Sequence, residues 1–261
     1  MKDMTRRKFL KLSALTAGVA ALSGCAPIGT SKSNYVPNPA QKTTKNWGML
    51  IDVDKIEDFQ KIQDACHKFH NVPNIPDAKR DVKWIWEESF EALFPEINHN
   101  AIAERYAHAP FVAVCNHCRE PVCVKVCPTQ ATFKNAEGVT MMDMHRCIGC
   151  RNCMAACPYG SRSFNFYDPR EYLDEVNPNY PTRRKGVVEK CDFCYERIRH
   201  GEVPLCVEAS GGAIIVGDLD DPESEISQII ASEMTIQRRP GIGTEPKLYY
   251  KVNLAGKEGA Q

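Results

Sequence analysis

The stretch CIGCRNCMAACP, residues 147–158, decides the fold, because it places four cysteines at the spacing C-x2-C-x2-C-x3-C-P. Three thiolates this close together on one tight loop can reach three metal ions of one small cubane. The fourth follows a three-residue helical step and points away, and Pro158 helps to turn the chain there. The spacing therefore predicts a metal–sulfur cluster that takes its fourth ligand from another part of the chain.

A second run lies upstream in CNHCREPVCVKVCP, residues 115–128, with the spacing C-x2-C-x4-C-x3-C-P. The residues after each run also correspond, since CPTQATF at 127–133 parallels CPYGSRSF at 157–164, which indicates an internal duplication. Two such runs are expected to exchange their fourth ligands. The predicted iron–sulfur ligand sets are Cys115, Cys118, Cys123 and Cys157 for cluster 1, and Cys147, Cys150, Cys153 and Cys127 for cluster 2.

Zinc and disulfides are the alternatives for these cysteines. Zinc sites usually draw their ligands from pairs of cysteines rather than from four-cysteine runs that end in Cys-Pro. Disulfides suit an exported chain, but two cysteines separated by two residues are better placed to chelate a metal than to pair. The spacing thus favours iron–sulfur clusters, with a zinc-stapled exported interaction module as the alternative.

Three arginines lie near the two runs in the sequence: Arg146, Arg151 and Arg162. A positive charge beside an iron–sulfur cluster offsets the negative charge of its thiolates, so these residues are candidates for tuning the clusters. The alternative is that they belong to an ordinary solvated face.

A third set of cysteines is incomplete. It consists of Cys191, Cys194 and Cys206, and Ser210 stands where a fourth cysteine would be expected. One further cysteine, Cys66, stands alone in KIEDFQKIQDACHK, residues 55–68, a stretch that is expected to be helical. A three-cysteine set and a solitary cysteine each need an explanation.

The cysteine runs resemble those of the four-cluster ferredoxin-type subunits of exported oxidoreductases. This family includes electron-transfer subunits of molybdenum enzymes, polysulfide reductases and NrfC-type proteins, and the resemblance covers about residues 47–220. Within it the chain looks most like the iron–sulfur subunit of Dsr-type membrane complexes of sulfur metabolism. The resemblance implies electron transfer without substrate chemistry, between a multihaem cytochrome c and a polytopic quinone-interacting membrane subunit. A subunit of a molybdenum or nitrite-reduction system is the alternative.

The family pattern has four runs, and its first run corresponds here to Ile56, Phe59, Ile62 and Cys66. The first three, together with Ser210, would have held one cluster, so the resemblance implies three [4Fe-4S] clusters instead of four. The apolar residues would lie on one side of a helix and fill the vacated space. Cluster 3 would then be held by Cys66, Cys191, Cys194 and Cys206. Ser210 as an alkoxide ligand and Cys66 as a buried bystander are the alternatives.

The resemblance implies an α+β fold of two pseudo-symmetric ferredoxin-like modules. The expected boundaries are 111–167 for the inner module, 47–70 with 187–219 for the outer module, 71–110 for a helical insertion and 220–261 for a C-terminal extension. Residues 49–53 predict a strand. The insertion contains VKWIWEESFEALF at 82–94, which predicts an amphipathic helix packed on its own domain rather than on a partner. Gly and Pro near 240–246 predict an extended tail.

The N-terminus carries a targeting signal. Paired arginines in TRRKFLK, residues 5–11, precede an apolar run too short to span a membrane, which predicts twin-arginine export to the periplasm or the extracytoplasmic membrane face. The signal is expected over 1–25 and a linker over 26–46. Cys25 fits a lipid-modification pattern, with an ordinary cleavage site as the alternative. The 33 basic and 33 acidic residues give no electrostatic footprint for nucleic acid.

Overall fold

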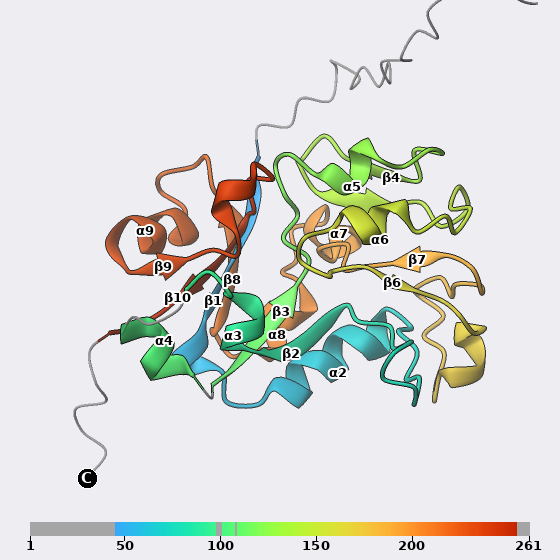
Figure 1. Ribbon diagram of the computed structural model, residues 1–261, viewed down its shortest axis with the longest axis horizontal. Helices are drawn as coiled ribbons and strands as arrows, with labels where there is room; N and C mark the ends of the chain where they lie inside the picture. The colour runs from blue at the N-terminus through green and yellow to red at the C-terminus, as the bar shows by residue number, and fades with distance from the viewer. Residues whose placement is uncertain (1–44, 98–100, 108, 255–261) are drawn as a thin grey trace, which may run out of the picture. The chain divides into compact units, whose positions relative to one another are not determined.

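The computed structural model describes residues 45–97, 101–107 and 109–254, so the predicted export signal and Cys25 lie outside the described residues. The main sheet has the strand order β8-β1-β10-β9, in which β1 runs parallel to β10 and antiparallel to β8 (Figure 1). Its strands are β1 (Trp47–Asp52), β8 (Ile214–Asp218), β9 (Thr235–Ile236) and β10 (Leu248–Lys251). The strand predicted over 49–53 is therefore confirmed as most of β1.

Three two-stranded antiparallel ribbons accompany this sheet. They are β2 (Ile85–Ser89) with β3 (Pro110–Val114), β4 (Thr132–Lys134) with β5 (Thr140–Met142), and β6 (Ser163–Phe164) with β7 (Val188–Glu189). In Figure 1 the β4–β5 and β6–β7 ribbons lie on the opposite side of the main sheet from α9. Small separate sheets and short helices make the fold α+β.

The helices are α2 (Phe59–Phe69), α3 (Phe90–Leu93), α4 (Ala101–Tyr106), α5 (Val122–Lys125), α6 (Asn152–Ala156), α7 (Tyr195–Ile198), α8 (Leu205–Ala209) and α9 (Glu225–Ser232). Short 3-10 turns occur at η2 (Val53–Lys55), η3 (Pro169–Tyr172) and η4 (Pro240–Ile242). None of the helices within the described residues is long and apolar enough to cross a bilayer.

Helix α2 begins later than the sequence predicted. Asp58 is its N-cap, and its side chain accepts a hydrogen bond from the Lys61 N–H at 3.1 Å. Ile56 therefore precedes the helix, so the expectation that it shares one helical side with Phe59 and Ile62 is wrong. Ile62 is buried in the core, whereas the other two are half-buried against it.

The prediction of a helix over 82–94 is wrong. Residues 85–89 form β2, which pairs with β3, and only Phe90–Leu93 is helical, capped by the Ser89 hydroxyl. Trp84, Ile85 and Trp86 are all buried, although alternate residues of a strand face opposite ways, because the core covers both faces. Pairing with β3 thus outweighs the helical periodicity. The prediction that the aromatic residues pack on their own domain is confirmed.

The C-terminal region is not an extended tail within the described residues. Its strand β10 lies in the middle of the main sheet, and the buried Tyr250 hydroxyl donates to the Val112 carbonyl at 3.0 Å. Residues 244–247 pair with the first cysteine loop, since the Lys247 N–H donates to the Asn116 carbonyl at 3.0 Å and the Glu120 N–H donates to the Thr244 carbonyl at 3.0 Å. We call residues 238–247 the cover segment.

Candidate metal centres

The four cysteines predicted for cluster 3 line one small cavity. Cys66 comes from α2 and Cys206 from α8, and these two helices pack against each other. Cys191 and Cys194 come from the turn that follows β7, where Cys194 adopts a left-handed backbone with φ 47°. The solitary cysteine and the incomplete set therefore meet, although more than a hundred residues separate them in the sequence.

The thiols in this cavity strongly resist ionisation when no cation is present. Burial raises the pKa of Cys66 well above its usual value, and the neighbouring Cys191 and Cys206 raise it further. Burial also raises the pKa of Cys194, and the neighbouring Cys206 and Cys66 raise it further. Four desolvated sulfurs this close together require positive charge among them before all can be thiolates. This donor set fits an iron–sulfur cluster.

Ser210 has a different role from the cysteines. Its hydroxyl donates to the Val207 carbonyl at 2.8 Å and accepts from the Ile214 N–H at 2.9 Å, so it joins the end of α8 to β8. A hydroxyl that donates its proton to a carbonyl is not an alkoxide, and the alkoxide alternative is wrong.

The cysteines predicted for cluster 1 also lie together. Burial raises the pKa of Cys118, and together with the other three members, Cys115, Cys123 and Cys157, it brings this pKa to about 12. Cys157 is the last cysteine of the second run, and it approaches the first three of the first run. This is the arrangement that ligand exchange between duplicated runs requires.

The set predicted for cluster 2 lies nearer the surface. Cys150 is exposed, and Cys147 lies near Cys153. Cys127 follows α5, which packs against α6 of the second run. Although burial raises its pKa, backbone N–H groups of Thr132 and Thr129 lower the pKa of Cys127 overall, which favours the thiolate. The sulfur of Cys127 is therefore in hydrogen-bonding contact with Thr129 and Thr132.

All twelve cysteines within the described residues are free, which excludes disulfides between them. Their neighbours also give the order of the three sets. Burial raises the pKa of Cys191, and Cys115 of the cluster 1 set raises it further. Burial likewise raises the pKa of Cys153, and Cys123 of the cluster 1 set contributes. The cluster 1 set therefore lies between the other two.

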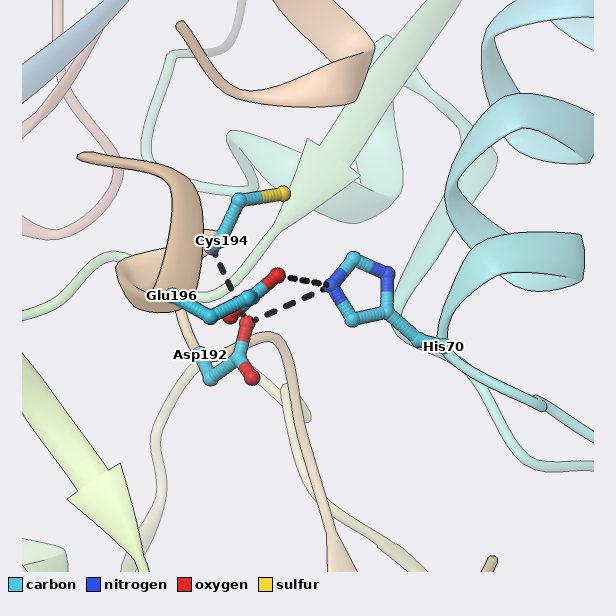
Figure 2. A group of neighbouring side chains, drawn as sticks. All are labelled: His70, Asp192, Cys194 and Glu196. Carbon is cyan, nitrogen blue, oxygen red and sulfur yellow. Dashed lines mark hydrogen bonds and ion pairs between the residues drawn. The ribbon is translucent and has the colours of Figure 1, made fainter. Parts of the chain in front are cut away.

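His70 is a site residue that the sequence interpretation missed. Its Nδ1 lies 2.8 Å from the Cys66 carbonyl oxygen and 3.7 Å from the Cys66 Sγ, and its Nε2 lies 3.2 Å from Glu196 Oε1. Figure 2 shows the ring facing Asp192, Glu196 and Cys194, whose ligand atoms with those of His70 lie within 4.8 Å of one another. The position four residues after Cys66, one helical turn on, was the signal that could have found it.

Gly149 makes the second cysteine loop possible. Its φ is +71°, and an added Cβ would lie 2.4 Å from the Gly186 carbonyl oxygen. We expect Gly149→Ala to lower the free energy of unfolding and the iron content, because the 147–153 loop must move. Gly160 is the matched control, since its φ is +66° with no atom within 4 Å of a Cβ. There alanine should cost only ~1–2 kcal/mol of backbone strain and retain iron.

Urea unfolding and an iron assay on anaerobic protein compare the two variants. Equal iron content and equal destabilisation in both would contradict the close approach of the two loops.

Comparisons with known proteins bear on the chemistry of these sets. The family model described as "4Fe-4S dicluster domain" matches residues 107–168. The chain is 40% identical to the Hdr-like menaquinol oxidoreductase iron–sulfur subunit 1 of Archaeoglobus fulgidus, over 95% of this chain and 97% of the relative. The chain belongs to the family of iron–sulfur electron-transfer subunits of oxidoreductase complexes.

This iron–sulfur subunit has other relatives of comparable extent. It is 36% identical to the menaquinone reductase iron–sulfur cluster-binding subunit of Nitratidesulfovibrio vulgaris, over 78% of this chain and 88% of the relative. It is 31% identical to protein NrfC of Escherichia coli K12, over 94% of each chain. The subunit therefore binds iron–sulfur clusters and transfers electrons for a complex, and it is not itself the catalytic subunit.

Proposed function

We propose that this subunit holds three [4Fe-4S] clusters on the three cysteine sets, in two pseudo-symmetric ferredoxin-like modules. It would relay electrons between a polytopic quinone-interacting membrane subunit and a multihaem cytochrome c in a Dsr-type complex. The observation that carries the cluster count is the meeting of Cys66 with Cys191, Cys194 and Cys206 around one cavity. Two relatives named for menaquinol and menaquinone support the quinone partner.

The clusters supply single-electron transfer when they are bound, and the chain's own residues hold and separate them. The cluster 3 set excludes water, because Cys66, Cys194 and Cys206 are buried. At the other end Cys150 is exposed, and the neighbouring Ile148 is an apolar side chain with 67% of its surface accessible. An exposed edge flanked by an apolar contact suits transient docking of a redox partner.

The same proposal includes location. The paired arginines of residues 5–11 favour export by the twin-arginine route and a position at the extracytoplasmic face of the membrane. A lipid on Cys25 would add only a weak anchor, so attachment to the membrane would depend on the partner subunit.

Anaerobic purification of the native complex through a tag on this chain tests the proposal. We expect about twelve irons per chain for three cubanes. A polytopic membrane subunit and a multihaem cytochrome should co-purify, and a menaquinol analogue should reduce the clusters. About sixteen irons per chain would contradict the three-cluster count. Stoichiometric zinc without iron would contradict the clusters themselves, and a co-purifying molybdenum subunit would favour the molybdenum-enzyme alternative over the Dsr-type complex.

A further inference from the structure

Three buried cations surround the cluster 1 set without a carboxylate partner within the described part of the chain. Arg162, Arg238 and Lys247 are only 5%, 6% and 4% exposed. Each donates instead to a neutral oxygen, at 3.1 Å from Arg162 to Thr132 Oγ1, 3.2 Å from Arg238 to the Tyr159 carbonyl, and 2.8 Å from Lys247 to the Gly138 carbonyl. We call these three residues the cation trio.

Part of the hydrogen-bonding capacity of the trio is unused. Nη2 of Arg162 and both Nε and Nη1 of Arg238 are buried atoms without a hydrogen-bond partner. Elsewhere the chain does neutralise a buried arginine, because Arg183 meets the fully buried Glu189 at 2.5 Å. A buried charge without a counter-ion is strongly unfavourable, so the trio requires negative charge close by.

Each member of the trio approaches a different part of the cluster 1 set. Burial lowers the pKa of Arg162, but Cys123 and Cys115 of the cluster 1 set and Cys153 of the cluster 2 set raise it overall, so Arg162 lies between these two sets. Burial lowers the pKa of Arg238 and of Lys247, whereas Cys157 opposes this for Arg238 and Cys118 for Lys247. The backbone also places Lys247 beside this set, since its N–H donates to the carbonyl of Asn116, which lies between Cys115 and Cys118 in the sequence.

The outer two sets have different surroundings. Asp192 and Glu196 lie beside the cluster 3 set, where they add negative charge to that of the sulfurs. The cluster 2 set shares Arg162 with the cluster 1 set, but it includes the exposed Cys150, and its other nearby arginines, Arg146 and Arg151, are exposed, so water screens their charges. Lys190, which is buried, donates to the Thr140 and Cys191 carbonyls at the boundary between the cluster 3 and cluster 1 sets. The middle set thus has the most positive buried surroundings.

We propose that the cation trio provides the counter-charge of cluster 1 and gives this middle cluster the highest reduction potential of the three. Reduction adds one negative charge to a desolvated cluster, and fixed positive charge nearby stabilises that form most. One electron would arrive from a neighbouring cluster, rest on cluster 1 and leave to the other neighbour, with no bond made or broken. This inference rests on the proposed ligand set of cluster 1.

The test is a redox titration of the holoprotein followed by EPR. Arg238→Gln and Lys247→Met remove charges that face cluster 1 alone. Each is expected to lower the equilibrium constant for reduction of the first-reduced cluster at least tenfold, or about 59 mV for one electron. Arg151→Gln is the control, an exposed arginine beside cluster 2, and should change that constant less than twofold. Arg162→Lys keeps the positive charge and should leave the reduction potential of the first-reduced cluster unchanged, whereas Arg162→Gln should lower that potential.

Three variants can overturn the inference. Cys66→Ala should leave the first-reduced EPR signal in place, since the signal belongs to cluster 1 and not to cluster 3. If that signal disappears in Cys66→Ala, or if its potential is unchanged in both Arg238→Gln and Lys247→Met with iron retained, the inference is wrong. Either result would leave the proposed function standing, because the protein would still hold iron–sulfur clusters, whereas a wild-type preparation without cluster signals would contradict the proposed function.

Discussion

Replacing Cys66 by alanine should remove cluster 3 or convert it to a three-iron form, so that iron falls from about twelve to about eight or eleven atoms per chain. Cys66 is the one member of its set that α2 contributes, and it closes a cavity lined also by the three downstream cysteines. The other two sets share no cysteine with this cavity. Iron analysis and EPR of anaerobic protein measure the loss, and the signals of clusters 1 and 2 should persist.

Ser210→Ala is the matched control for this variant. Its hydroxyl hydrogen-bonds to Val207 and Ile214 rather than to the cysteines, so its loss should leave iron content unchanged. It should lower the free energy of unfolding by only about 1 kcal/mol. Unchanged iron and EPR signals in Cys66→Ala would mean instead that Cys66 is a buried bystander.

Replacing Glu189 by leucine is expected to give the largest loss of stability, about 3–5 kcal/mol, because it leaves the Arg183 guanidinium buried without a counter-charge. Glu189 is fully buried and accepts from Arg183 at 2.5 Å, from Trp84 Nε1 at 2.9 Å and from Asn165. It lies two residues before Cys191, so this network also holds the turn that carries the cluster 3 cysteines. Urea unfolding of the anaerobic holoprotein measures the loss.

A double variant separates the buried charge from simple packing. Arg183→Met combined with Glu189→Leu should be more stable than Glu189→Leu alone, since no uncompensated charge is left. The exposed pair of Lys68 and Asp64, 3.0 Å apart with 79% and 44% of their side chains accessible, is the control. Lys68→Met should cost less than about 1 kcal/mol. A double variant no more stable than the single one would contradict the electrostatic explanation.

The local features of the site could be predicted from the sequence, because the spacing of cysteines in a short loop determines which sulfurs can reach one cluster. The exchange of Cys157 into the first set follows from the duplicated runs, and the place of Cys66 follows from counting ligands against the family pattern. The α+β class was also accessible in this way. These predictions depend on covalent spacing, which tertiary packing changes little.

Other features depend on contacts between distant segments. Residues 85–89 have a helical pattern in isolation, but β3 supplies a backbone partner that a helix would not use. Arg238 and Lys247 looked like parts of a tail, because no local pattern shows that the cover segment pairs with the loop near Cys118. Of the three arginines that the sequence singled out, only Arg162 is buried, and burial decides which of them retains an unscreened charge.

The parallel pairing of β10 with β1 joins the last described strand to the first. During synthesis β1 emerges about two hundred residues before β10, so the middle of the main sheet stays open until β10 has followed. The cover segment reaches the loop around Cys118 in the same late step. A growing chain that has not yet reached the cover segment therefore leaves the loop around Cys118 uncovered.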